Sequence, residues 1–331
     1  MVSAGHFLAT QAGFDILEAG GNAVDAGVAA GMALGVVQSD MVQIAGVAPS
    51  MINLADRNEV LTISGLGYWP IAANIDRFIE EFDGSIPIGL LRTVVPAAPD
   101  AWIMALEKYG TMSFGDVASA SIRYARDGFS MHHVMHDYLT AHEATYRSYP
   151  SSAEIYLPGG RLPDVGENFV QSDLAASIQF MVDEERAAAG KSRAVGLQAA
   201  RDAFYKGDLA RTMADYHRDN GGWLTREDLA GFSSAIEAPV RTTYRGIDVY
   251  TCDAWCQGPV LQQMLSLLKG YDLPALGHNS AEYIHIVAEA IKLSFADRER
   301  YYGDPRFVDV PLEGLLSDAY AVERRKMIRP D

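Results

Sequence analysis

Residues 285–311 read HIVAEAIKLSFADRERYYGDPRFVDVP, and this stretch decides the fold. Apolar residues recur in it at helical spacing, which predicts an amphipathic helix over residues 281–302. The following Asp304-Pro305 ends the helix, because the proline ring and its missing N–H cannot continue one. The predicted apolar face consists of Ile284, Val287, Ile291 and Phe295.

Two further helices are predicted near the N-terminus. Residues 7–19 have helical spacing of apolar positions, and Gly20-Gly21 supplies a stop. Asn22 can cap the next helix, with Asp25 near the positive end of its dipole. That helix, AVDAGVAAGMALGVV over residues 23–37, consists mostly of Ala and Gly. Small side chains permit close approach of other elements, so we expect this helix to be central and buried.

In the middle of the chain, the sequence marks the boundaries between elements less clearly. Residues 74–130 are mostly helical by pattern, and further helices are expected up to about residue 220. Residues 150–166 are rich in Pro and Gly and are predicted to form a loop. Thr225 is expected to cap a short helical turn, with Asp228 at the third position.

The predicted strands are short and antiparallel. Residues 51–54 and 60–63 are β-type runs separated by a polar turn at residues 55–58. Residues 239–251 alternate apolar and polar around Arg245-Gly246, which predicts a second hairpin. Because helices outnumber strands and no βαβ pattern occurs, the fold class is predicted as α+β.

Composition narrows the classes of function. The chain has 331 residues, 49% of them apolar and 21% charged, as in an ordinary globular protein. Its net charge of −16 argues against nucleic-acid binding, because phosphates would be repelled. The most apolar run, Ala26 to Val37, is shorter than the roughly 20 residues that a membrane-spanning helix needs. No export signal is visible, so we expect a cytoplasmic protein without a membrane partner, although a segment upstream of Met1 could be missing.

Two groups of residues could in principle bind metal. Cys252 and Cys256 form a CxxxC pair, but no further Cys or His stands near them, which favours plain structural cysteines over a four-ligand zinc site. His132, His133 and His136 have helical spacing without a matching acid, which favours surface or capping histidines. We therefore predict no metal and no cofactor.

A series of short motifs runs through the chain in a fixed order. They span about residues 10 to 311, and each is weak alone. Together they resemble the large subunit of the gamma-glutamyltranspeptidase family. The motifs are GGNAVDA (20–26), KYGTM (108–112), ARDGF (125–129), FYKG (204–207), GGWLTREDL (221–229), YRG (244–246), ADR (296–298) and GDP (303–305).

The resemblance implies a four-layer αββα sandwich of the N-terminal nucleophile hydrolase type, completed by a small subunit. Residues 1–331 would then be a single large-subunit domain. A precursor would cut itself before a threonine beyond Asp331, and that threonine would become the nucleophile, with its own α-amine as base. The resemblance therefore places no catalytic residue in this chain. It also allows a dimer of heterodimers.

The chain departs from the family where substrate is recognised. The family strand ends in DFREMAP, whose arginine holds the γ-glutamyl carboxylate, and such a bidentate contact suits a carboxylate. Counting back from Pro70, Leu66 stands at the arginine position and Gly67 at the adjacent acid. The family's GGGGF and PPPSSGG loops are likewise replaced here, by AGVAP (45–49) and DAWCQGP (253–259).

The altered positions define the candidate substrate site. With Leu66, the side chains Tyr68, Trp69, Trp255 and Gln257 could form a remodelled pocket for a small neutral or aromatic amide. The competing interpretation is hydrophobic infill or ordinary core, since aromatic residues are commonly buried. A replacement cation could be supplied by Arg92, which could equally be a solvated loop arginine.

The predicted function is hydrolysis of a small amide by a gamma-glutamyltranspeptidase-like amidohydrolase through an acyl-enzyme. One alternative is a true gamma-glutamyltranspeptidase or glutathione hydrolase that reads the carboxylate with Arg92. Another is a non-catalytic relative of the family.

Overall fold

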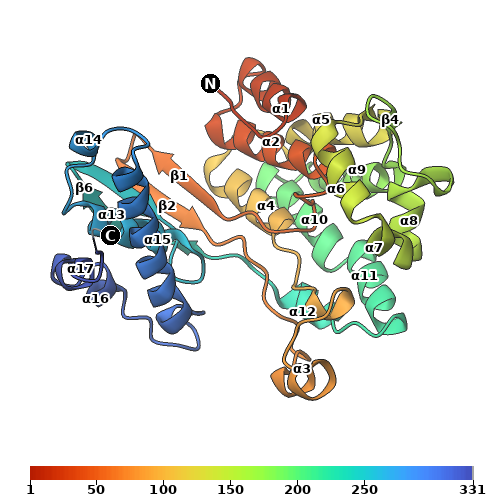
Figure 1. Ribbon diagram of the computed structural model, residues 1–331. Coiled ribbons are helices and arrows are strands. Elements are labelled where there is room, and N and C mark those ends of the chain that lie inside the picture. Colours follow the sequence, from red (N-terminus) through yellow and green to blue (C-terminus); the bar gives the residue numbers. More distant parts are fainter. Residues whose placement is uncertain (330–331) are drawn as a thin grey trace. The chain divides into compact units, whose positions relative to one another are not determined.

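The computed structural model describes residues 1–329 and divides into two compact units (Figure 1). The first unit comprises residues 1–49 and 65–235, and the second comprises residues 50–64 together with the chain from residue 236 onward. The prediction of a single domain over residues 1–331 stays a prediction, and its last two residues lie outside the described part.

The first unit is helical, and its centre is the predicted Ala- and Gly-rich helix, α2 (Ala23–Val37). Asn22 and Asp25 form a capping box at its start, as expected from the sequence. Ten of its fifteen residues are buried, which confirms the prediction of a central helix. It packs against α1 (Phe7–Glu18), α4 (Ala98–Tyr109) and α5 (Phe114–Asp127).

Further helices surround this centre, and α9 packs against both α5 and α10. The strands of this unit are two residues each, β3 (Phe129–Ser130) paired with β4 (Asn168–Phe169). The helices are α3 (Ile75–Phe82), η1 (Leu90–Arg92), α6 (His133–Ala141), α7 (Glu143–Ser148), α8 (Pro150–Tyr156), η2 (Pro158–Gly160), α9 (Ser172–Ala188), α10 (Arg193–Tyr205), α11 (Asp208–Asp219) and α12 (Arg226–Gly231).

One predicted loop is partly wrong. Residues 150–166 were expected to be irregular because they are rich in Pro and Gly, but the first seven form α8. Pro150 occupies the first turn of this helix, where its fixed φ and missing N–H cost nothing. The remainder, from Leu157 on, is a 3₁₀ turn followed by irregular chain, as predicted.

The second unit contains the antiparallel strands that the sequence predicted. A three-stranded sheet has the order β1 (Ser50–Leu54), β2 (Glu59–Ile63) and β5 (Ile236–Glu237) (Figure 1). A separate hairpin pairs β6 (Val240–Tyr244) with β7 (Ile247–Thr251). The α+β class is thus confirmed.

In the second unit, α13 (Gly258–Leu268) packs on the β6–β7 hairpin. The helix predicted over residues 281–302 is α15 (Ala281–Tyr301), and it packs on α13. Asp297 of the ADR motif is buried and accepts hydrogen bonds from Gln263 on α13 and from Tyr320 and Arg324 on α17. The motif therefore fastens three helices together. The shorter helices of the unit are α14 (Leu273–Leu276), α16 (Leu312–Leu315) and α17 (Asp318–Arg325).

None of the helices described in residues 1–329 is long and apolar enough to cross a membrane.

Candidate functional site

Within the predicted substrate segment, residues 64–70, the part from Gly65 to Tyr68 is held between two other backbone segments of the first unit. The Ala48 N–H donates to the Gly65 carbonyl at 2.8 Å, on one side. The Val95 N–H donates to the Tyr68 carbonyl at 2.8 Å, on the other. The three altered or adjacent stretches, around residues 46–48, 65–68 and 94–97, therefore form one backbone framework.

Gly67 is the tightest point of this framework. A Cβ placed on it would lie 1.8 Å from the Val95 carbonyl oxygen and 3.1 Å from a Val94 methyl group. No side chain fits there, because such a contact is far below van der Waals distance. The glycine that replaces the family's acid at this position therefore permits the close approach of residues 94–95.

Tyr68 and Trp69 project into different aromatic contacts. The Tyr68 ring meets Phe232 edge-on, with centroids 5.4 Å apart. The Trp69 ring meets Phe78 edge-on at 5.8 Å, and Phe78 in turn meets Trp223 at 5.2 Å. Both predicted site residues keep an exposed surface, 37% for Tyr68 and 42% for Trp69. Each ring is thus packed against another aromatic ring while part of its surface stays exposed.

Buried polar groups anchor the segments that carry these rings. Asp228 accepts a hydrogen bond from the Ile71 N–H at 2.9 Å, directly after the predicted segment. Its other oxygen accepts from the Thr225 N–H at 2.9 Å, and the Thr225 side chain accepts from the Asp228 N–H at 3.1 Å, which confirms the predicted cap. Arg201 donates to the Phe232 carbonyl at 2.5 Å and pairs with the buried Asp100. The GGWLTREDL motif therefore positions the substrate segment as well as its own helix.

Tyr205 fixes the turn that faces Gly67. Its hydroxyl donates to the Pro96 carbonyl at 2.8 Å and accepts from the Asp100 N–H at 3.2 Å. The side chain is fully buried, and burial together with the nearby Asp100 charge raises its pKa. The phenol therefore stays protonated and acts as a structural donor.

Arg92 is exposed and donates hydrogen bonds to backbone carbonyls of its own loop. Its Nε donates to the Pro87 carbonyl and its Nη2 to the Ile86 carbonyl, both at 3.0 Å. Two of its five N–H donors are therefore occupied. The role of Arg92 as a replacement cation stays a prediction.

The remaining predicted residues lie in the second unit, in the loop between β7 and α13. Trp255 donates from its indole Nε1 to Glu237 of β5 at 2.9 Å. Gln257 is exposed, and its Oε1 accepts from Arg298 of α15 at 2.7 Å. The bond from Arg298 orients the amide, and the Gln257 NH2 group is its donor end toward a ligand.

The six predicted residues thus form two sets. Leu66, half-buried, stands with Tyr68, Trp69 and Arg92 in the first unit, and Trp255 stands with Gln257 in the second. Sequence reasoning missed the residues that hold these sets. Phe232 and Phe78 were ordinary aromatics in the sequence, and Glu237 carried no motif. The partners missed in this way are Phe78, Val95, Phe232, Glu237 and Arg298.

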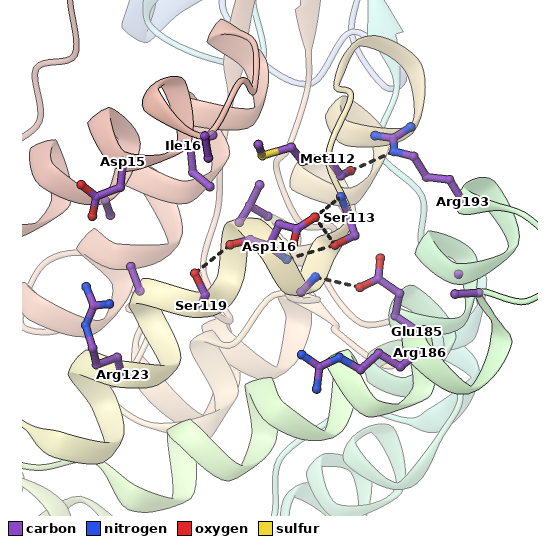
Figure 2. A pocket seen from close by; sticks show the side chains of 17 residues that line it. Asp15, Ile16, Met112, Ser113, Asp116, Ser119, Arg123, Glu185, Arg186 and Arg193 are labelled. Atoms are coloured by element: carbon purple, nitrogen blue, oxygen red, sulfur yellow. Dashed lines mark hydrogen bonds between the residues drawn. The ribbon is translucent and has the colours of Figure 1, made fainter.

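The first unit also contains a cavity of about 820 Å³ that is separate from the predicted substrate residues (Figure 2). It lies among α1, α5, α9 and α10, and none of the six predicted residues lines it. Glu185 accepts from the Phe114 and Gly115 N–H groups at 2.7 Å each, and so occupies the start of α5. Arg193 donates to the Met112 carbonyl at 2.8 Å and to the Leu106 carbonyl at 2.6 Å. These charges serve the fold.

The histidines have the structural roles expected of them. His132 caps α6 by accepting from the Met135 N–H at 3.3 Å, and its other nitrogen lies 3.0 Å from the Val37 carbonyl. His133 is exposed, and His136 lies 3.6 Å from the exposed Asp137. Within residues 1–329, no three Cys, His, Asp or Glu side chains are grouped so that they could hold a metal ion.

Comparison with known proteins gives a consistent result. The family model for gamma-glutamyltranspeptidase matches residues 9–331. The acylase ACY 1 proenzyme of a Pseudomonas species is 36% identical over 339 residues, and the glutathione hydrolase-like YwrD proenzyme of Bacillus subtilis is 33% identical over 323. The matches cover 99% and 97% of this chain. The chain spans 58% of the length of each of these relatives.

A solved structure agrees with these matches. The gamma-glutamyltranspeptidase of Helicobacter pylori superimposes with a TM-score of 0.91 at 30% sequence identity. That likeness covers 100% of this chain and 92% of the other.

Proposed function

The chain belongs to the gamma-glutamyltranspeptidase family, and from this premise we propose that it is the large subunit of an amidohydrolase that cleaves a small amide. The predicted fold of the N-terminal nucleophile hydrolase type is confirmed by the solved relatives. The partner in this proposal is a small subunit made from the same precursor, and the substrate is a small molecule.

The proposed reaction is acyl transfer. The small subunit's N-terminal threonine attacks the amide carbonyl, its α-amine takes the hydroxyl proton, and preorganised donors hold the oxyanion. The amine leaves with a proton, and water releases the acyl group. This chain's share is to bind and orient the acyl side with the half-buried Leu66 and the rings of Tyr68 and Trp69 in the first unit. Trp255 stays a proposed substrate-binding residue of the second unit.

The observation that supports a neutral acyl group is the packing at Gly67. The Val95 carbonyl occupies the space where an acidic side chain would begin, and Leu66 supplies no charge beside it. A substrate carboxylate placed there would lose water without gaining a cation, which costs several kcal/mol in general. Exposed aromatic surface at Tyr68 and Trp69 suits an apolar acyl group instead.

The alternative is a glutathione hydrolase in which Arg92 binds the γ-glutamyl carboxylate. Arg92 already donates to the carbonyls of residues 86 and 87, so its reach is limited by its own loop. This observation favours the neutral-amide proposal. Assaying the mature enzyme with γ-glutamyl anilide and with neutral N-acyl anilides distinguishes the two. Robust turnover of the γ-glutamyl compound would contradict the proposal of a remodelled pocket.

A non-catalytic relative is the remaining alternative. Expression of the full precursor, followed by a denaturing gel, tests it directly. We expect two fragments, the smaller one beginning with threonine. A precursor that stays intact would overturn the proposal of an autoprocessed enzyme.

A further inference from the structure

Cys252 and Cys256 lie on the two sides of one tight turn in the second unit. Cys252 directly follows β7, and Cys256 stands two residues before α13. The turn is closed by a hydrogen bond from the Cys256 N–H to the Asp253 carbonyl at 3.1 Å. A Cβ on Gly258 would lie 2.9 Å from the Cys252 carbonyl oxygen, so the start of α13 packs closely against the end of β7. The two half-buried thiols therefore share one site.

The two thiols are chemically unequal. The Gly258 N–H donates to the Cys256 sulfur at 3.2 Å, and the two thiols hydrogen-bond each other. The bond from the Cys252 thiol, with the Gly258 donor, lowers the pKa of Cys256 to about 7, against burial and the charges of Asp253 and Glu237. The same pairing raises the pKa of Cys252. The Cys256 sulfur, which accepts from the Gly258 N–H, therefore has the environment of an attacking thiolate, whereas Cys252 has that of a protonated thiol.

We propose that Cys252 and Cys256 form a redox-active dithiol that is oxidised by small disulfides such as glutathione disulfide. The Cys256 thiolate attacks one sulfur of the small disulfide, forms a mixed disulfide and releases one thiolate, which takes a proton. The Cys252 sulfur then attacks the Cys256 sulfur, loses its own proton and releases the second small thiol. Two protein thiols are oxidised by two electrons to one disulfide, and one small disulfide is reduced to two thiols.

The consequence for the loop follows from its sequence. Trp255 lies between the two cysteines and Gln257 directly after them, so the disulfide would fix the loop that carries both predicted substrate residues. That consequence for activity rests on the proposed function. The thiol chemistry does not, and it is tested without turnover.

The test is thiol mapping of the mature, two-subunit protein. The protein is incubated with glutathione disulfide at neutral pH, acid-quenched, alkylated and digested with trypsin. Both cysteines fall in the tryptic peptide of residues 246–269. We expect this peptide to lose two hydrogens, to escape alkylation and to recover both thiols with dithiothreitol.

Two variants assign the roles. Cys252→Ser should stop at a stable mixed disulfide with glutathione on Cys256. Cys256→Ser should react at least about tenfold more slowly, since burial and the Glu237 charge still raise the pKa of its remaining thiol when Cys256 is gone. Persistently free thiols in the folded wild type would overturn the proposal. Equal reactivity of the two single variants, or disulfide-linked dimers on a non-reducing gel, would also overturn it.

The pH dependence gives an independent readout. The titratable groups facing the thiols are Glu237 of β5, Asp253 of the turn and Tyr302 after α15. Burial, together with the charge of Asp297, raises the pKa of Tyr302. Alkylation of Cys256 should therefore rise with pH with a midpoint of about 7. A midpoint at the ordinary thiol value would contradict the assignment of Cys256 as the nucleophile.

Discussion

Asp25 and Thr111, 86 positions apart in sequence, are joined by two kinds of hydrogen bond. The Thr111 hydroxyl donates to Asp25 Oδ2 at 2.7 Å, and the Thr111 N–H donates to Oδ1 at 2.9 Å. Asn22 adds a bond from its side-chain amide to the Tyr109 carbonyl at 2.7 Å. The motifs GGNAVDA and KYGTM therefore form one structural joint between α2 and the end of α4.

Replacing Asp25 with Asn should destabilise the protein by about 3 kcal/mol, because a buried, charged acceptor of several N–H and O–H groups is lost. Urea unfolding measures the change. Asp15→Asn, on the exposed side of α1, is the matched control and should stay within about 0.5 kcal/mol of wild type. Equal effects of the two variants would contradict the joint.

The loss should also depend on pH. Burial raises the pKa of the Asp25 carboxyl, but hydrogen bonds from Asn22, Thr111 and Met112 outweigh it, so its pKa lies below the usual value. The unfolded carboxyl, with a pKa of about 3.9, binds its proton first as the pH falls. The stability advantage over Asp25→Asn should be complete above about pH 5 and be lost as the pH falls through the folded pKa. A difference that is the same at neutral and strongly acid pH would contradict this.

Gly67→Ala should destabilise the first unit by about 3 kcal/mol, because the new methyl group would overlap the Val95 carbonyl oxygen. The control is Gly27→Ala, which makes the same chemical change on α2 where nothing lies within 4 Å. That control should be neutral or slightly stabilising, since Ala favours helix. Chemical denaturation of both variants gives the comparison, and a neutral Gly67→Ala would show that the segments 65–68 and 94–97 are not held together.

Asp228→Ala should leave the Ile71 N–H without its acceptor, because this N–H donates to the Asp228 carboxylate at 2.9 Å. Hydrogen exchange of this amide should become about tenfold faster, as expected for one lost hydrogen bond of about 1.4 kcal/mol. Thr225→Ala is the control, because it removes the helix cap but keeps the bond to Ile71. Equally fast exchange at Ile71 in both variants would contradict the anchoring role of Asp228.

Trp255→Phe should lower kcat/KM for a neutral amide about tenfold, because the ring loses the hydrogen bond to Glu237 that orients it. Global stability should change by less than about 1 kcal/mol, since the loop is only half-buried. Glu237→Gln keeps an acceptor for the indole N–H and should stay close to wild type. Unchanged kinetics in Trp255→Phe would contradict a role of this residue in substrate binding.

Local signals predicted much of the fold. Asn22 and Thr225 are caps in the structure, because a short polar side chain at a helix start binds the free N–H groups wherever the helix lies. The hairpin around Arg245-Gly246 was predicted with its turn, and both residues have positive φ, as such a turn requires. The loop prediction was wrong at Pro150, because proline not only interrupts helices but is also common in their first turn.

The candidate site was predicted less completely, for a physical reason. The sequence singled out Gly67, Trp255 and Gln257 by their departure from a motif, but their partners lie far away along the chain. The contact of Gly67 with Val95 and the bond of Trp255 to Glu237 depend on how distant backbone segments meet. No local periodicity or spacing encodes such contacts, so only coordinates reveal them.

The most direct test of the account is the ratio of kcat/KM for two anilides measured on the mature, two-subunit enzyme. One carries a γ-glutamyl group and the other a neutral acyl group of similar length. Without a cation at position 66, the neutral substrate should be favoured at least about tenfold, and Leu66→Arg should shift the ratio toward γ-glutamyl by a similar factor, as one charge-assisted hydrogen bond allows. Preference of the unmodified enzyme for the γ-glutamyl anilide would contradict the account.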